Sequence, residues 1–145
     1  MNNGTARILV VDDDPTIRLL AREILEQNGF TVTEADNGRN ALEHFAATGG
    51  DLVLLDVMMP ELDGFATCQR LRQTPAGSQV PIVMMTGLED SASIQRAYDA
   101  GATDFIVKPI IWSILAQRAR YILRASNALR EVAGRAGKGA LGLVE

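Results

Sequence analysis

The stretch RILVVDDDP, residues 7–15, decides how this chain begins to fold. Its first part, Arg7 to Val11, is a short run of mostly aliphatic residues, which predicts a buried strand. Asp14 and Pro15 are a preferred N-cap and a preferred first residue of a helix. Apolar residues then recur with helical spacing as far as Asn28-Gly29, where the helix should end. A strand followed directly by an amphipathic helix is the unit from which parallel α/β sheets are built.

The same unit recurs along the chain, so we expect five strands that alternate with helices in a parallel sheet. The third and fourth strands are almost entirely apolar, as strands covered on both faces should be, and the second alternates like an edge strand. The predicted strands are Arg7 to Val11, Thr31 to Ala35, Asp51 to Leu55, Pro81 to Met85 and Thr103 to Val107.

The composition is that of a single globular domain. The chain has 145 residues, of which 47% are apolar and 22% charged, and its mean hydropathy is close to zero. No apolar run approaches the ~18 residues that cross a bilayer, and Met1 to Arg7 lack the apolar stretch of a secretory signal. Cys68 is the only cysteine, which excludes a disulfide within the chain and a cysteine metal site. We therefore expect a cytoplasmic location and no membrane association.

Charge is distributed unevenly along the chain. Residues 1–110 contain 16 acidic and 8 basic residues, whereas residues 111–145 contain 2 acidic and 6 basic ones. The basic end has too few cations and aromatic residues for a nucleic-acid surface, so it predicts a linker or an interface and no direct nucleic-acid binding. Lysine is rare, because Lys108 and Lys138 are the only lysines among 14 cations.

The last predicted helix runs from Ile110 to about Val132, roughly twice the usual length. Beyond it, Ala133 to Glu145 holds four glycines in 13 residues and no apolar period, which predicts a flexible tail or a cloning remnant. We therefore expect a domain over residues 6–125, a helical linker extension over 126–133 and a tail over 134–145.

Polar side chains follow four of the five predicted strands, and ligands bind at this edge of an open parallel sheet. Three of them, Asp12, Asp13 and Asp56, would repel one another strongly unless a cation lies among them. Lys108 supplies one positive charge, and oxygen ligands without His or Cys suit Mg²⁺. Asp56 is the best candidate for a nucleophile toward phosphorus, and Thr86 could donate a hydrogen bond to a phosphoryl oxygen.

These residues resemble a known family through ILVVDD (residues 8–13), LLD (54–56) with Met59-Pro60 and Asp63-Gly64, MTG (85–87), and Asp104-Phe105 through Lys108-Pro109. The chain resembles the receiver domain of two-component response regulators over residues 6 to about 125. The resemblance implies an α/β, flavodoxin-like, doubly wound (βα)5 fold with sheet order 2-1-3-4-5 and an extended C-terminal helix. It also implies a phosphoacceptor rather than an enzyme, with a sensor histidine kinase or a phosphotransfer protein as its partner.

The resemblance assigns a role to each matching residue. It implies that Asp56 is phosphorylated, that Asp13 and Asp56 bind Mg²⁺ directly, and that Asp12 acts through a metal-bound water. Met58 would offer its backbone carbonyl to the metal, Lys108 would contact the phosphoryl group, and Lys108-Pro109 is a candidate cis bond. Thr86 and Phe105 would move on phosphorylation and promote a homodimer. The apolar Met58 and Leu88, at positions that tune dephosphorylation, predict a phosphorylated state that is not especially short-lived.

Two stretches, residues 84–90 and 120–130, resemble receivers joined by a long helix to diguanylate cyclase or phosphodiesterase domains, which predicts an output in cyclic-di-GMP turnover. Two other functions stay open at this point. A haloacid-dehalogenase-like phosphatase would use Asp12 as nucleophile and Asp14 as acid and base, since residues 12–16 also read Asp-x-Asp-x-Thr. A docking domain that is never phosphorylated would form no adduct at all.

Overall fold

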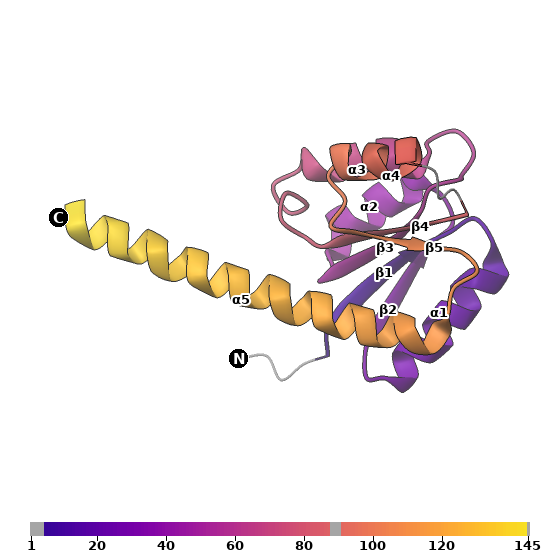
Figure 1. The fold of residues 1–145 in the computed structure, drawn as a ribbon, viewed down its shortest axis with the longest axis horizontal. Helices are drawn as coiled ribbons and strands as arrows, with labels where there is room; N and C mark the ends of the chain where they lie inside the picture. Colours follow the sequence, from indigo (N-terminus) through magenta and orange to yellow (C-terminus); the bar gives the residue numbers. More distant parts are fainter. Residues whose placement is uncertain (1–4, 88–90, 145) are drawn as a thin grey trace.

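The computed structural model describes residues 5–87 and 91–144, with side chains as far as Gly134. Within these residues, five strands alternate with five helices (Figure 1). The elements are β1 (Arg7–Val11), α1 (Pro15–Gln27), β2 (Thr31–Ala35), α2 (Gly38–Thr48), β3 (Leu52–Asp56), α3 (Gly64–Arg72), β4 (Ile82–Thr86), α4 (Ser91–Asp99), β5 (Asp104–Val107) and α5 (Trp112–Val144). All neighbouring strands are parallel, in the order β2-β1-β3-β4-β5, which confirms the predicted flavodoxin-like fold.

The sheet lies between two layers of helices, as Figure 1 shows. Helices α2, α3 and α4 cover one face, where they pack on side chains such as Leu55 and Met84. Helices α1 and α5 cover the other face, against Leu54 and Met85. All residues of β3 and β4 are buried, whereas β2 is only partly buried and lies at the edge of the sheet, so the predicted central and edge strands are confirmed. This arrangement gathers the carboxyl ends of the strands at one edge of the sheet.

The first helix begins where the sequence predicts. Asp14 is its N-cap, and the carboxylate of Asp14 accepts a hydrogen bond from Thr16 N at 2.9 Å. Pro15 occupies the first helical turn, and Asn28 is the C-cap. The capped start fixes the direction in which the chain leaves β1.

Helix α5 is longer than the sequence predicts. Its first turns bury Leu115, Ala119 and Ile122 against the sheet. The helix then projects away from the domain and continues to Val144, where a flexible tail was expected from residue 134 (Figure 1). Helical hydrogen bonds are made within the segment, so a helix can run through glycines, although each costs about 1 kcal/mol relative to alanine.

Outside the domain, α5 carries exposed apolar side chains. Leu129 and Val132 are more than half exposed, as is Tyr121 nearer the domain. Leu115 and Ile122, nearer the start of the helix, are buried in the core of the domain. Among residues 5–87 and 91–144, no helix is both long enough and apolar enough to cross a membrane.

Candidate functional site

Three carboxylates meet at the carboxyl edge of the sheet. Asp12 directly follows β1 and Asp56 ends β3, and these two strands are neighbours. Asp12 is fully buried, Asp56 is 3% exposed, and Asp13 is exposed. One oxygen from each carboxylate lies within 4.8 Å of the other two. The prediction that these side chains converge is therefore confirmed.

Lys108 reaches the same point from the loop after β5. Its Nζ lies 2.9 Å from Asp12 Oδ2 and 3.1 Å from Asp56 Oδ1. The predicted cis bond is present between Lys108 and Pro109. The backbone N–H of Lys108 donates to the carbonyl of Thr86 at 2.7 Å, which ties the loop to the end of β4. The lysine that stood out in the sequence therefore bridges the two buried carboxylates.

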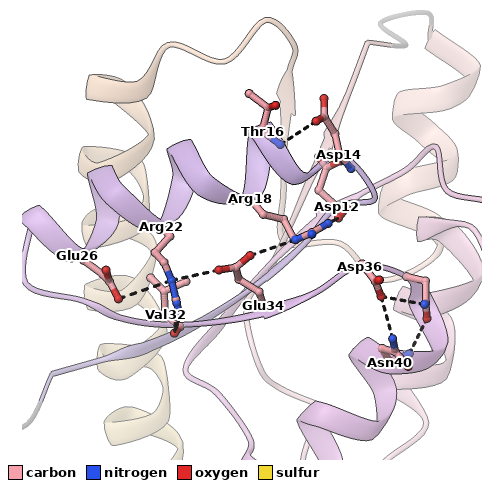
Figure 2. Close-up of polar contacts among 11 residues, drawn as sticks. Asp12, Asp14, Thr16, Arg18, Arg22, Glu26, Val32, Glu34, Asp36 and Asn40 are labelled. Carbon is pink, nitrogen blue, oxygen red and sulfur yellow. Dashed lines mark hydrogen bonds and ion pairs between the residues drawn. The ribbon is translucent and has the colours of Figure 1, made fainter.

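Asp12 is held by several donors. Its Oδ1 accepts a hydrogen bond from Asp14 N at 2.9 Å, while Lys108 occupies Oδ2. Its backbone carbonyl accepts a bond from Arg18 Nη1 at 2.7 Å, and Figure 2 shows this arginine lying between Asp12 and Glu34. The two hydrogen bonds to its carboxylate offset the cost of burying this group beside a second carboxylate.

The site changes the acidity of two groups. Burial raises the pKa of Asp56 to about 6, and the negative charge of Asp12 adds to this effect, while Lys108 opposes it. Burial alone would lower the pKa of Lys108, but its hydrogen bond to Asp12 and the charges of Asp12 and Asp56 outweigh burial and raise it. At neutral pH the lysine is therefore charged and Asp56 is mostly ionised. Burial and the charge of Asp12 nevertheless favour loss of the negative charge on Asp56.

We expect the metal-free protein to lose stability through Asp56 as the pH rises from about 4 to about 6. The pKa of this group goes from 3.8 to about 6 on folding, so the folded state holds a proton in this window that the unfolded state has released. The full shift corresponds to about 3 kcal/mol. Urea unfolding across this pH range should show wild type losing stability relative to Asp56→Asn. Parallel curves for the two proteins would contradict the shift.

Thr86 lies beside this cluster, and Phe105 lies on the adjacent strand. Thr86 is fully buried at the end of β4, one residue beyond Met85, which pairs with Asp56. Phe105 is 9% exposed and belongs to the core layer under α2, α3 and α4. The structure therefore places Thr86 at the carboxyl edge and Phe105 two residues before the end of β5, with its ring in the core.

The loop after Asp56 approaches the site closely. Val57 N donates to Met85 O at 3.0 Å, and Gly64 N donates to Val57 O at 2.9 Å. A side chain at Gly64 would collide with the backbone oxygen of Asp56, so this position requires glycine. In the sequence Gly64 is part of the Asp63-Gly64 motif, but the pattern of residues does not show that position 64 packs against the backbone of Asp56. Met58 is 61% exposed, and Leu88 lies outside the described residues.

The donor set fits Mg²⁺. Three carboxylates from two strand ends face one point, and none of the clustered residues is a His or a Cys. Hard oxygen ligands with room for water are what Mg²⁺ prefers. The charge of Lys108 compensates only part of the charge of three carboxylates, so a cation would relieve the remaining repulsion.

Comparison with known proteins identifies the class. A sequence model of the response regulator receiver domain matches residues 8–120. The chain therefore belongs to the receiver domain family of response regulators.

Individual relatives agree with this assignment. The response regulator MprA of Mycolicibacterium vanbaalenii is 43% identical over 121 residues, which are 83% of this chain and 52% of that protein. The transcriptional regulatory protein CseB of Streptomyces coelicolor is 40% identical over 117 residues, 81% of this chain and 49% of that protein. The chain thus spans about half the length of these curated relatives. Among solved structures, chemotaxis protein CheY4 of Vibrio cholerae has a TM-score of 0.79 at 30% identity, covering 81% of this chain and 98% of CheY4.

The family assignment removes the main alternative. A haloacid-dehalogenase-like enzyme would need Asp14 as a free acid and base, but the exposed Asp14 carboxylate caps α1. Both carboxylate oxygens of Asp12, its supposed nucleophile, already accept hydrogen bonds, Oδ1 from Asp14 N and Oδ2 from Lys108.

Proposed function

We propose that this chain accepts a phosphoryl group on Asp56 in an Mg²⁺-dependent reaction, with a sensor histidine kinase or a phosphotransfer protein as donor. The observation that carries the proposal is the placement of Asp56, which ends a central strand beside a buried acid and a lysine. Membership of the receiver family supports the same reaction. A cytoplasmic location is part of the proposal.

The proposed step forms an acyl phosphate. A carboxylate oxygen of Asp56 attacks phosphorus, the bond between phosphorus and the donor imidazole nitrogen breaks, and that nitrogen keeps the electron pair and takes up a proton. Lys108 is close enough to Asp56 to turn from the carboxylate to a new phosphoryl oxygen, and Thr86 would donate its hydroxyl to another. Lys108 would thereby exchange the negative charge of the Asp56 carboxylate for that of the phosphoryl group as its partner.

Asp13 and Asp56 would bind Mg²⁺ directly, Asp12 through a water, and Met58 through its backbone carbonyl. The bound ion would supply positive charge against the phosphoryl oxygens. The exposure of Asp13 leaves one side of the cluster open to solvent, where a phosphodonor could approach.

The direct test is chemical. Incubation with acetyl phosphate and MgCl₂, followed by mass-spectrometric mapping, should place one acyl phosphate on Asp56. Omission of Mg²⁺ with added chelator should abolish the label. An adduct on Asp12 would contradict the proposal and support the haloacid-dehalogenase-like phosphatase mechanism. The absence of any adduct in the presence of Mg²⁺ would support a docking domain.

We further propose that phosphorylation shifts Thr86 and Phe105 and alters the face formed by α4, β5 and α5. Exposed apolar side chains on this face, including Tyr98, Ile111 and Ile114, support an interface with a second copy. The curated relatives are described as a response regulator and a transcriptional regulatory protein, and we propose that a regulatory output is controlled here as well. An output in cyclic-di-GMP turnover stays a prediction from the resemblance.

We expect phosphorylation to favour a homodimer. Sedimentation velocity at increasing concentration, with and without acetyl phosphate and Mg²⁺, should show a larger dimer fraction for the phosphorylated protein. Tyr121 is 66% exposed on α5 and provides a second test. The Tyr121→Ser variant should form less dimer in the same experiment and should still be labelled on Asp56. A phosphoprotein that stays monomeric at high micromolar concentration would contradict the proposal.

A further inference from the structure

The backbone of Asp12 is held by an arginine of α1. Arg18 Nη1 donates to the Asp12 carbonyl oxygen at 2.7 Å, across six residues of chain (Figure 2). The contact closes the loop between β1 and α1 beside the carboxylate cluster. A guanidinium donor makes the bond charge-assisted, and such bonds are shorter and stronger than those between neutral groups.

The oxygen that Arg18 binds belongs to the peptide group that joins Asp12 to Asp13. Because a peptide group is planar, fixing the direction of its carbonyl also fixes the N–H of Asp13 and the plane that contains both α-carbons. The carboxylates of Asp12 and Asp13 branch from these two α-carbons. The Arg18 contact therefore constrains how the two acids of the cluster are placed relative to each other.

Arg18 is itself held in place by β2. Its Nε donates to Glu34 Oε1 at 3.1 Å, and its side chain is only 19% exposed. Glu34 pairs in register with Val10, two residues before Asp12, so it lies beside the end of β1. A guanidinium fixed at Nε has fewer rotamers to lose when its other nitrogens bind the carbonyl. These contacts connect Glu34 on the edge strand β2, through Arg18 of α1, to the backbone of Asp12.

A second arginine of α1, Arg22, contacts the same Glu34 carboxylate and hydrogen-bonds to the backbone of β2. Arg22 Nε lies 3.1 Å from Glu34 Oε2, and Arg22 Nη2 donates to Val32 O at 2.9 Å. In Figure 2 it lies one turn farther along α1, over the middle of β2. Arg22 shares with Arg18 its residue type, its helix and its acidic partner, so it is a matched control.

We propose that Arg18 is a positioning residue for the metal site, which holds the peptide between Asp12 and Asp13 so that their carboxylates are preset to bind Mg²⁺. The inference rests on the proposed Mg²⁺-dependent phosphorylation. Arg18 acts through the backbone of Asp12. Without Arg18, the peptide between Asp12 and Asp13 loses one of its restraints, so binding of the ion has to restrict it further, and affinity falls.

The test compares Arg18→Met with Arg22→Met, each of which keeps an apolar stem and removes one positive charge. Isothermal titration with MgCl₂ gives the affinity of the metal alone. We expect Arg18→Met to bind Mg²⁺ about tenfold more weakly, as when groups that orient metal ligands are removed, and Arg22→Met to stay within about twofold of wild type. Labelling of Asp56 by acetyl phosphate should be slow in Arg18→Met at low Mg²⁺ and recover at saturating Mg²⁺, which a general loss of stability would not produce.

Further outcomes decide the proposal. Equal Mg²⁺ affinities for Arg18→Met and Arg22→Met would overturn it and leave Arg18 as a structural tie. If urea unfolding shows that Arg18→Met does not fold, Glu34→Gln takes its place, because it weakens the anchor of Arg18 without removing the contact to Asp12. A roughly threefold weaker Mg²⁺ affinity for Glu34→Gln supports the proposal, and an unchanged affinity overturns it. Absence of Mg²⁺ binding by wild type would overturn the proposed function itself, a result distinct from equal binding by the variants.

Discussion

Replacing Asp56 with asparagine is expected to abolish phosphorylation by acetyl phosphate. The carboxamide oxygen is a poor nucleophile and the amide carries no charge to bind a metal, so incorporation should fall at least about a hundredfold. The replacement is nearly isosteric, and it removes the charge of a residue that is only 3% exposed, so the fold should persist. Mass spectrometry of the intact protein measures the label, and urea unfolding confirms that the variant is folded.

Asp63→Asn is the matched control for this prediction. Asp63 lies on the loop that follows Asp56 and caps α3, with its Oδ1 accepting a hydrogen bond from Ala66 N at 2.9 Å. Asparagine caps a helix about as well as aspartate, so this variant should be labelled as wild type is. Full labelling of Asp56→Asn, or loss of labelling in Asp63→Asn alone, would contradict the assignment of Asp56.

Replacing Lys108 with methionine is expected to have the largest effect on stability. Asp12 and Asp56 would remain buried together without the cation that now lies about 3 Å from both. Breaking one side of a buried ion pair costs several kcal/mol, and partial exposure of Lys108 reduces this to about 2–3 kcal/mol at pH 7. Urea unfolding in the absence of Mg²⁺ measures the change, and labelling of Asp56 should fall in parallel.

The double variant Lys108→Met with Asp56→Asn makes this prediction specific. If the cost comes from carboxylate repulsion, removing one carboxylate should restore much of the stability lost in the single lysine variant. Arg118→Met is the control, because it breaks the Arg118 to Asp104 pair at 2.9 Å, in which the arginine side chain is 41% exposed. That surface pair should contribute less than about 1 kcal/mol. Additive losses in the double variant would contradict the coupling.

Much of this architecture could be predicted because local signals and the sheet agree. The apolar runs of β1, β3 and β4 are buried on both faces, and Asp14 caps α1 as its position before Pro15 indicates. The carboxyl ends of parallel strands must share an edge, so the convergence of Asp12, Asp56 and Lys108 followed from topology.

Other features depend on contacts that strand and helix patterns do not contain. The arginine–carbonyl contact of Arg18 depends on a rotamer and on Glu34 from another strand. The need for glycine at position 64 comes from the path of a neighbouring backbone. The length of α5 was underestimated because glycines reduce helix propensity, whereas the backbone of this segment still makes its own hydrogen bonds.

Helix α5 begins four residues after Lys108 and runs unbroken for 33 residues. At about 1.5 Å per residue it is a rod of about 50 Å, much longer than the strands that anchor its first turns. A tilt of only about 5° at the anchored end moves the far end of such a rod by about 4 Å. A lever of this length converts an angular change too small to disturb the core into a displacement about as large as the distance between two heavy atoms in contact.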